Sequence, residues 1–372
     1  MAEIDRNSGE PVYRQIYEIL RGEIAQSIYD VSGKLPSEKE LKNRFGVERN
    51  TVRNALKLLA DDGLIVKAPG YGSKIAGSAE TSESANNLKI NGNIRNILFI
   101  TQQNYLQNDN GEYFHLKLID GLDRIFSPAN YNLIFKSSGG DFNLLNAVNL
   151  TEPAAIIFDS YNHKDLYETA KSLNIPCVSV NHYTPAVTSV VNNNFDGSYR
   201  VIKMLAEAGH KRIAFITGKE NYQTTIERLS GINSYYMKNN IYLDKKYIIP
   251  GQWHFNSGFE AGEQILAMKP RERPTAVFAF NDDMAFGCLS CFEKRGVNVP
   301  DEISIVGFDK SDRYASIFRP ITTVDVNIGA IVEYTFWYLT GLIQNTAPSV
   351  CVKIQIETVI QDNGTVKNIK ND

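Results

Sequence analysis

The stretch LPSEKELKNRFGVERNTVRNAL, residues 35–56, decides the fold of the first part of this 372-residue chain. Ser37 is a good helix N-cap, and Glu40 three residues later completes a capping box. This helix is expected to end at Gly46. A further helix starts near Glu48, with apolar residues at the i, i+3, i+4 and i+7 spacing of one buried face. That face consists of Val52, Ala55, Leu56 and Leu59.

The flanking sequence completes a small domain. A helical pattern begins at Pro11, because proline is tolerated in the first turn of a helix. Its apolar positions are Val12, Ile16, Ile19, Leu20, Ile24 and Ile28. After Gly63, residues 64–66 are expected to form a strand, 70–72 a tight turn and 73–76 a return strand. The predicted order is helix, helix, turn, helix and a two-stranded wing.

The polar face of the helix after Glu48 suits DNA reading. In a helix-turn-helix the second helix enters the major groove, where Arg reads guanine and Asn pairs with adenine. Thr and Lys suit phosphate, and glycine lets a wing backbone approach a groove. The alternative is an ordinary charged, solvated face, which the capped preceding helix and the glycine wing disfavour. The candidate residues are Lys39, Arg49, Asn50, Thr51, Arg53 and Gly72.

Charge is unevenly placed along the chain. The formal net charge of −3 argues weakly against a nucleic-acid partner. Residues 34–74, however, contain nine Lys and Arg against five Asp and Glu, a local charge of +4. A whole-chain value conceals such a patch.

The motifs PVYRQIYEILRGEI, LPSEKELKNRFGVERNTVRNALKLLADDGLI and GYGSKI resemble the winged helix-turn-helix of the GntR transcription regulators, over residues 11–76. The resemblance implies that Glu38, Arg49 and Arg53 contact the operator and that Gly72 lies at the wing tip.

Two positions depart from that family pattern. Lys39 stands where Arg is common, and Glu48 stands where Ser usually precedes the recognition arginine. A carboxylate at this place is repelled by phosphate. Glu48 is therefore expected to pair with Arg49 or Arg53, or to cap the helix.

The composition after residue 77 changes twice. The polar stretch SAETSESANNLKINGNIR predicts a linker, which gives an N-terminal domain at 1–77, a flexible linker at 78–94 and a large domain at 95–372. Seven near-continuous apolar runs alternate with helical patterns in the large domain, which predicts an α/β fold with parallel strands covered on both faces. The expected strands are 96–100, 132–138, 154–159, 177–181, 212–218, 276–281 and 303–309.

The motifs HKRIAFITG, IERLSGINSYY, RPTAVFAFNDDMAFGCLSCFEKRGVNVPDEISIVGFD and RPITTVDVNIGAIVE resemble the effector domain of the LacI/GalR repressors, which is similar to periplasmic sugar-binding proteins. The resemblance is strongest over 191–332 and extends over 95–362. It implies two α/β subdomains, joined by crossover strands, that close around a sugar.

That resemblance, together with the polar residues that follow several strands, gives a candidate effector site. Ligands in parallel sheets bind at the carboxyl ends of strands. A sugar needs planar donors and acceptors and an aromatic platform. The alternative for each residue is a structural strand-end cap or a core aromatic. The candidates are Phe114, Asn181, Arg228, Trp253, Asn281 and Asp309. His182 is expected at the pocket edge, and His210 is expected to be structural.

Other chemistry is not expected. Cys288 and Cys291 lack partners at metal spacing and fit buried positions on a helix. Asp282 beside Asp283 suggests a metal, but capping of the following helix by Asp282 is favoured. No hydrolase or phosphate-binding motif occurs, so neither an enzyme nor a cofactor is expected. The absence of a signal peptide and of a long apolar run indicates a cytoplasmic protein without a membrane partner.

The two resemblances together predict a sugar-responsive repressor that binds a palindromic operator as a homodimer. The combination resembles arabinose-responsive repressors, so arabinose or a related pentose or hexose is the first expectation for the effector. An activator, or a sensor of a non-sugar molecule, remains the alternative. A transport-type sugar-binding module is a third possibility, which the N-terminal domain disfavours.

Overall fold

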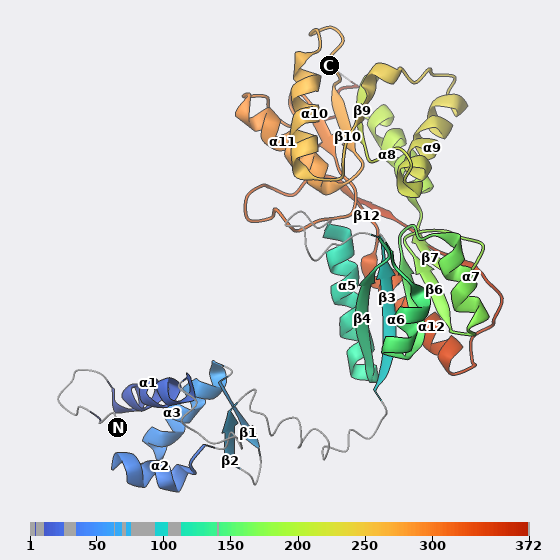
Figure 1. The fold of residues 1–372 in the computed structure, drawn as a ribbon. Coiled ribbons are helices and arrows are strands. Elements are labelled where there is room, and N and C mark those ends of the chain that lie inside the picture. Colours follow the sequence, from blue (N-terminus) through green and yellow to red (C-terminus); the bar gives the residue numbers. More distant parts are fainter. Residues whose placement is uncertain are drawn as a thin grey trace. The chain divides into compact units, whose positions relative to one another are not determined.

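The structure is a computed structural model in which the chain forms two compact units, residues 1–93 and 94–372 (Figure 1). It describes residues 4, 11–25, 35–62, 64–68, 72–75, 94–102, 113–139 and 141–370. The expected linker 78–94 lies outside the described residues except for Ile94. Ile28, Gly63 and the first two residues of the expected turn at 70–72 also lie outside them.

The described part of unit 1 has the expected order of helices and wing. Its elements are α1 (Val12–Ala25), α2 (Glu38–Phe45), α3 (Arg49–Asp61), β1 (Ile65–Ala68) and β2 (Gly72–Ile75). The two strands pair antiparallel. One core collects the apolar faces of the three helices, and it includes Ile16, Leu20, Leu41, Phe45, Val52, Ala55, Leu56 and Leu59.

The bounds of α2 follow from its caps. The Ser37 N–H donates to Glu40 Oε2 at 2.7 Å, and the Glu40 N–H donates to Ser37 Oγ at 3.3 Å, which confirms the capping box. Gly46 ends the helix with φ 59°, and its N–H donates to the Lys42 carbonyl. A left-handed residue at this place suits glycine, so the chain turns tightly into α3.

The first half of unit 2 is built on a six-stranded parallel sheet, here called the six-stranded half. Across the sheet the strands are β13 (Lys353–Ile356), β7 (Thr188–Asn192), β6 (Cys177–Val180), β5 (Pro153–Asp159), β3 (Arg95–Thr101) and β4 (Tyr131–Ser137). Its helices are α5 (Tyr113–Phe126), η1 (Ser127–Ala129), α6 (Leu144–Thr151), α7 (Lys164–Ser172) and α12 (Ile328–Ile343). Ile97 and Phe99 of β3 join one core, and Leu98 and Ile100 join another, so both faces of the sheet are covered.

The second half is built on a four-stranded parallel sheet, here called the four-stranded half. Its strands are β11 (Ser304–Val306), β10 (Ala276–Ala279), β8 (Ile213–Thr217) and β9 (Ile248–Pro250). Its helices are α8 (Asn194–Glu207), α9 (Gln223–Lys238), η2 (Lys245–Tyr247), α10 (Phe255–Ala267) and α11 (Asp282–Lys294). Helices α10 and α11 touch backbone to backbone, because a Cβ on Gly258 would lie 2.0 Å from the Met284 carbonyl oxygen.

Three segments of the described chain cross between the two halves. The first joins β7 to α8, the second runs through β12 (Thr323–Asp325) into α12, and the third joins β13 to β14 (Val359–Gln361). β12 pairs antiparallel with β14 and lies between the halves in Figure 1. These two strands, here called the hinge, therefore connect the two halves. This α/β architecture and all seven expected strands are confirmed; β7, β9, β12, β13 and β14 were not expected.

His210 has the structural role that the sequence predicts. Its ring nitrogens lie 2.9 Å from Thr275 Oγ1 and 3.0 Å from the Lys367 carbonyl oxygen. The Ser304 hydroxyl lies 3.2 Å from the same ring. The imidazole thus ties the C-terminal segment to the four-stranded sheet. Burial lowers the pKa of His210, which favours the neutral ring.

Candidate functional site

The outer face of α3 carries three of the predicted DNA-contacting side chains. Arg49, Asn50 and Arg53 are exposed, whereas Val52 on the opposite face is fully buried. The helix is therefore amphipathic in the sense expected from the sequence. Its contacts with DNA remain a prediction.

Glu38, at the start of α2, holds both arginines of this face. Arg49 Nε lies 2.7 Å from Glu38 Oε2, and Arg53 Nε lies 3.1 Å from the same oxygen. The hydrogen bond from Arg49, ahead of the one from Arg53, lowers the pKa of Glu38 and keeps it ionised. Both bonds use Nε, and no other described residue bonds either guanidinium group. The terminal nitrogens are thus left to act as a bidentate fork.

The remaining predicted DNA contacts lie around this face. Lys39 is exposed on α2. Thr51 is half-buried, and its N–H donates to the Glu48 carbonyl at 3.0 Å. Gly72 begins β2 opposite Ala68.

The expectation for Glu48 was wrong. Glu48 occupies the N-cap position of α3, but its side chain makes no capping hydrogen bond. It pairs instead with Lys42 of α2, with 3.3 Å between Nζ and Oε2. The reason is that Glu38 already occupies the Nε donors of Arg49 and Arg53, while Lys42 is left for the second carboxylate.

Glu38→Gln is expected to lower the preference of the protein for its operator over other DNA. A neutral amide holds the arginines less firmly, so the ratio of specific to non-specific affinity falls by roughly 1 kcal/mol, about fivefold. Loss of a negative charge raises non-specific binding at the same time. Competition binding against random DNA measures the ratio. Glu48→Gln is the matched control, because it removes the same charge beside α3 without contacting either arginine; equal effects of the two variants would contradict the role of Glu38.

A cavity of about 560 Å³ lies between the two halves of unit 2. All six predicted effector residues line it: Phe114, Asn181, Arg228, Trp253, Asn281 and Asp309. The first two come from the six-stranded half and the others from the four-stranded half. Asn181, Asn281 and Asp309 each follow a strand of a parallel sheet, which is where ligands of such sheets bind.

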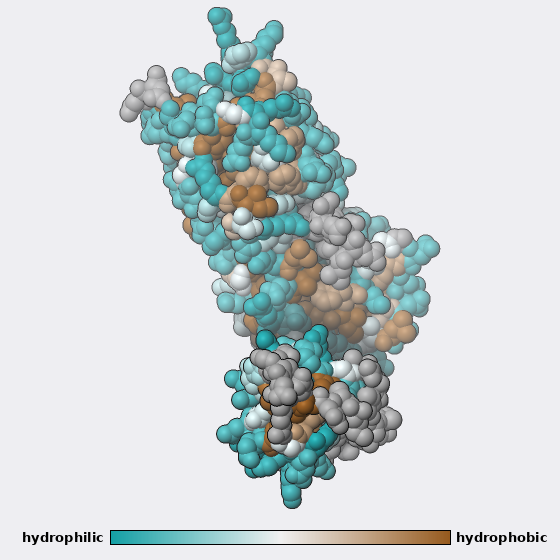
Figure 2. Space-filling view, turned by 90° about the vertical axis from the view of Figure 1, so that its left-hand side faces the viewer, coloured by the Kyte–Doolittle hydropathy of each residue, from teal (hydrophilic) through white to brown (hydrophobic). Residues whose placement is uncertain are grey.

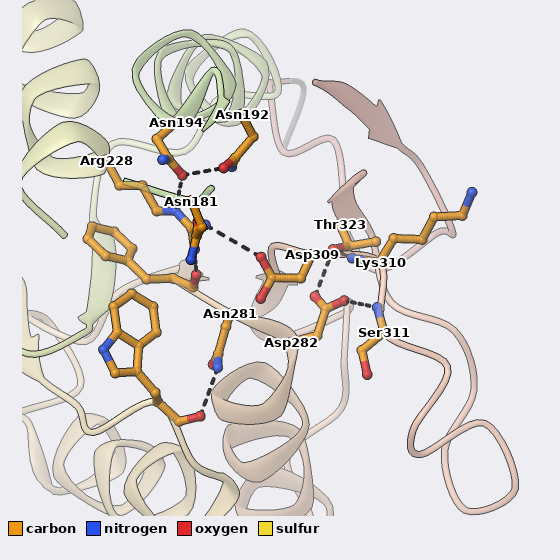
Figure 3. A network of polar contacts seen from close by, with 12 residues as sticks. Asn181, Asn192, Asn194, Arg228, Asn281, Asp282, Asp309, Lys310, Ser311 and Thr323 are labelled. Atoms are coloured by element: carbon orange, nitrogen blue, oxygen red, sulfur yellow. Dashed lines mark hydrogen bonds and ion pairs between the residues drawn. The ribbon is translucent and has the colours of Figure 1, made fainter. Parts of the chain in front are cut away.

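Arg228 is the most enclosed charged group of the cavity wall (Figure 3). Its Nε donates to Asn194 Oδ1 at 2.9 Å, and one terminal nitrogen donates to the Phe280 carbonyl. The other lies 3.4 Å from Asp309 Oδ1. The guanidinium group also stacks on Phe308, 3.6 Å from the ring centroid. Burial lowers the pKa of Arg228, and the nearby carboxylate of Asp309 opposes that change. The two groups therefore form a largely buried ion pair in the cavity wall.

Asn281 and Trp253 combine structural bonds with a place in the cavity wall. Asn281 Oδ1 accepts from the Met284 N–H at 2.9 Å, and Asn281 Nδ2 donates to the Trp253 carbonyl at 2.8 Å. The Trp253 ring packs on Gly218, where a Cβ would lie 1.8 Å from the ring. Trp253 Nε1 is buried and has no partner among the described residues.

Asn281, not Asp282, caps α11, and the expectation for Asp282 was wrong. The Asn281 side chain accepts the capping bond from Met284. Asp282 accepts instead from the Ser311 N–H at 2.6 Å and from the Thr323 hydroxyl at 2.7 Å. Each oxygen of this carboxylate therefore accepts a hydrogen bond from a distant segment of the chain.

Several cavity residues were not singled out for this site from the sequence. His115 lines the cavity with its Nδ1 3.1 Å from Asp159 Oδ2, and both side chains are buried. The signal that the sequence offers for this pair is the position of Asp159 at the end of strand β5. Tyr183 and Gln223 also line the wall, and the Tyr183 N–H donates to Gln223 Oε1 at 3.0 Å across the two halves. His182 lines the cavity as expected.

Other expectations concern metal sites, thiols and membranes. Among the described residues no group of three or more His, Cys, Asp or Glu side chains could hold a metal ion. Cys288 and Cys291 are fully buried on α11, as expected. No helix in the described ranges is long and apolar enough to cross a membrane.

Figure 2 shows one face of the molecule, on which hydrophilic residues predominate and hydrophobic ones occur in separate groups.

Two family models match the chain. Residues 12–75 match the bacterial regulatory proteins of the gntR family. Residues 202–361 match the periplasmic binding protein-like domain. The first match lies in unit 1 and the second in unit 2, so the two resemblances found in the sequence are confirmed.

The chain is also similar to curated repressors. "HTH-type transcriptional repressor PurR" of Photobacterium profundum is 30% identical over 219 residues, covering 57% of this chain and 65% of that protein. "Probable HTH-type transcriptional repressor ExuR" of Bacillus subtilis is 30% identical over 241 residues, covering 62% and 70%. The chain thus spans 65% and 70% of the length of these two relatives.

A solved structure gives the same result for the fold. A LacI transcriptional regulator from Bacillus cereus subsp. cytotoxis NVH 391-98 matches with a TM-score of 0.65 and 25% identity, covering 74% of this chain and 99% of that chain. These similar proteins are transcription regulators, not enzymes.

Proposed function

We propose that this chain, which belongs to the LacI/GalR-type transcriptional repressors, is a DNA-binding repressor whose operator affinity is controlled by a small neutral sugar. One observation carries the proposal: the six residues predicted from the sequence to hold a sugar line a single cavity between the halves of unit 2. The gntR-type unit 1 supplies the DNA-reading helix.

The wall of the cavity has the chemistry that a sugar requires. Phe114 and Trp253 offer ring faces for the apolar side of a pyranose or furanose. Arg228, Asn281 and Asp309 offer planar donors and acceptors for vicinal hydroxyls.

The charge of the wall favours a neutral ligand over a sugar acid or a sugar phosphate. Arg228 is the one arginine among the described lining residues, and Asp309 already neutralises it. No lysine is present among those residues. Burial lowers the pKa of His182, which makes that ring a poor cation at neutral pH. L-Arabinose and related neutral monosaccharides are therefore the first candidates.

Control of DNA binding follows from linkage between two arrangements of the halves. A sugar that binds one arrangement more tightly shifts the population towards it. If that arrangement holds the DNA-binding units at the wrong spacing, the sugar weakens operator binding, and DNA weakens sugar binding by the same factor. We propose a cytoplasmic homodimer, because a palindromic operator is matched by a two-fold symmetric protein. Activation by the same architecture is the second candidate, since the effect depends on where the operator lies.

The test begins with the operator, which is obtained by selection from random-sequence DNA with the full-length chain. Thermal unfolding is then followed with L-arabinose, D-xylose, D-ribose, D-galactose and D-glucose, and with D-galacturonate as the charged control. A ligand present at 100 times its dissociation constant stabilises the protein by about 2.7 kcal/mol. We expect a neutral sugar both to stabilise the chain and to change its operator affinity.

Two outcomes would overturn the proposal in different parts. Failure to select any DNA sequence would exclude the operator-binding half. Selection of an operator with no response to any neutral sugar would exclude sugar control, and a response to D-galacturonate alone would exclude the neutral class.

A further inference from the structure

Asp282 joins the effector cavity to the hinge through its two carboxylate oxygens (Figure 3). It is the first residue of α11 and is only 1% exposed. Oδ2 accepts from the Ser311 N–H at 2.6 Å, and Oδ1 accepts from the Thr323 hydroxyl at 2.7 Å. These two donors belong to different parts of the chain.

Ser311 belongs to the segment that carries the ligand-facing carboxylate. This segment leaves β11 through Asp309, which lines the cavity and pairs with Arg228. The Lys310 N–H, between them, donates to the Thr323 hydroxyl at 3.3 Å. A shift of Asp309 towards a ligand therefore moves the groups that Asp282 holds.

Thr323 is the first residue of β12, the crossover strand that leads into α12 of the six-stranded half. The Asp309 N–H donates to the Val324 carbonyl at 2.8 Å, so the same strand touches the segment of Asp309 a second time. Lys310 Nζ pairs with Asp325 Oδ2 at 2.8 Å at the end of the strand. Residues 309–311, here called the cavity segment, are thus hydrogen-bonded alongside the hinge strand β12.

The carboxylate of Asp282 also packs against the backbone at Gly307. A Cβ on Gly307 would lie 1.9 Å from Asp282 Oδ1, so the oxygen rests directly on that backbone. Burial, and next the charge of Asp309, raise the pKa of Asp282 well above its usual range.

We propose that Asp282 is the positioning residue that couples occupancy of the effector cavity to movement of the hinge strand β12. This inference rests on the proposed function, because it assigns a route to the sugar control proposed above. The ligand touches Asp309 and Arg228, and the segment 309–311 moves with them. Asp282 transmits that movement to Thr323, and β12 carries it to the other half. The two hydrogen bonds that Asp282 accepts from Ser311 and Thr323 are here called the clamp. Without the clamp the ligand still binds, but its binding no longer selects one arrangement of the halves.

Two variants open the clamp from opposite sides. Asp282→Ala removes both acceptors. Thr323→Val removes the hydroxyl of β12, which donates to Asp282 and also accepts from the Lys310 N–H, while it keeps the side-chain shape. Asp283→Ala is the matched control, because Asp283 lies on the same turn of α11 and pairs at 3.0 Å with Arg313, which lies outside β12. Thr323→Val also remains informative if Asp282→Ala fails to fold.

The first readout is the coupling between sugar binding and operator binding. The dissociation constant of the sugar that stabilises the wild-type chain, beginning with L-arabinose, is measured by calorimetry with and without operator DNA. A typical allosteric ratio of these constants is about 5–150. In both clamp variants we expect the ratio to fall to within about threefold of 1, with sugar affinity in the absence of DNA changed by less than about threefold. A ratio that stays at the wild-type value in both variants overturns the proposal.

The second readout needs no ligand. Backbone amide exchange of β12 is expected to accelerate at least about tenfold in both clamp variants and to stay unchanged in Asp283→Ala. Unchanged exchange of β12 in Thr323→Val overturns the clamp even if no sugar is ever found. A wild-type chain that binds DNA but responds to no sugar overturns sugar control, so the two failures are distinguishable.

Discussion

Arg228→Ala is expected to abolish stabilisation by the effector and to lower the free energy of unfolding of unit 2. Arg228 is only 4% exposed, and its guanidinium group bonds Asn194, the Phe280 carbonyl and Asp309. Removing one partner of a buried ion pair leaves the other charge uncompensated, which costs about 3–5 kcal/mol. Thermal unfolding with and without the sugar measures both effects.

A conservative variant separates ligand binding from folding. Arg228→Lys keeps the positive charge beside Asp309 but loses the planar fork that can bond a diol in parallel. We expect it to recover part of the stability and little of the sugar response. Arg295→Ala is the matched control, because Arg295 pairs with Glu263 at the surface of the same half and should leave the sugar response intact. A full sugar response in Arg228→Ala would remove Arg228 from the site.

Local signals explain why much of the fold could be predicted. Ser37, Glu40 and Gly46 lie within ten residues of one another and fix the ends of α2 without reference to the rest of the chain. Most of the seven expected strands are buried on both faces of their sheets, so they appear in the sequence as near-continuous apolar runs. β12, with only three residues, carries no such run, and its pairing with β14 joins Thr323 to Gln361. That pairing is a long-range event that no local pattern encodes.

Part of the candidate site could be predicted as residues, but the bonds between those residues could not. The family resemblance placed Arg228 and Asp309 in one cavity, which is where the structure has them. It did not distinguish Asn281 from Asp282 as the cap of α11, because both side chains can accept from a backbone N–H at that position. Asp282 is bonded instead by the hydroxyl of Thr323, which lies 41 residues away in the sequence.

The same limit applies to unit 1. Glu48 is adjacent to Arg49 in the sequence, and Glu38 is close to both arginines of α3 only in the fold. The sequence pattern therefore favoured Glu48 as their partner. The fold brings Glu38 of the preceding helix under both Nε atoms and leaves Glu48 to Lys42. The partner of a surface charge is set by how two helices pack, not by distance along the chain.

Arg49→Ala and Arg53→Ala are each expected to weaken operator binding by about 1–3 kcal/mol for each base that the arginine reads. Both arginines donate Nε to the same carboxylate, so their effects are coupled. The loss in the double variant is therefore expected to differ from the sum of the two single losses by about 0.5 kcal/mol or more. Fluorescence anisotropy with the selected operator, at fixed salt, measures all four proteins of the cycle.

Lys57→Ala is the matched control for charge on the same helix. Lys57 is exposed on α3, two turns beyond Arg49, and removing it is expected to weaken binding to operator and random DNA alike. The arginine variants are expected instead to lose operator affinity preferentially and to keep the full sugar-induced stabilisation of unit 2, because the cavity lies entirely in that unit. Additive losses equal to that of Lys57→Ala would show that Arg49 and Arg53 contribute charge alone, and the fork geometry set by Glu38 would then have no part in reading the operator.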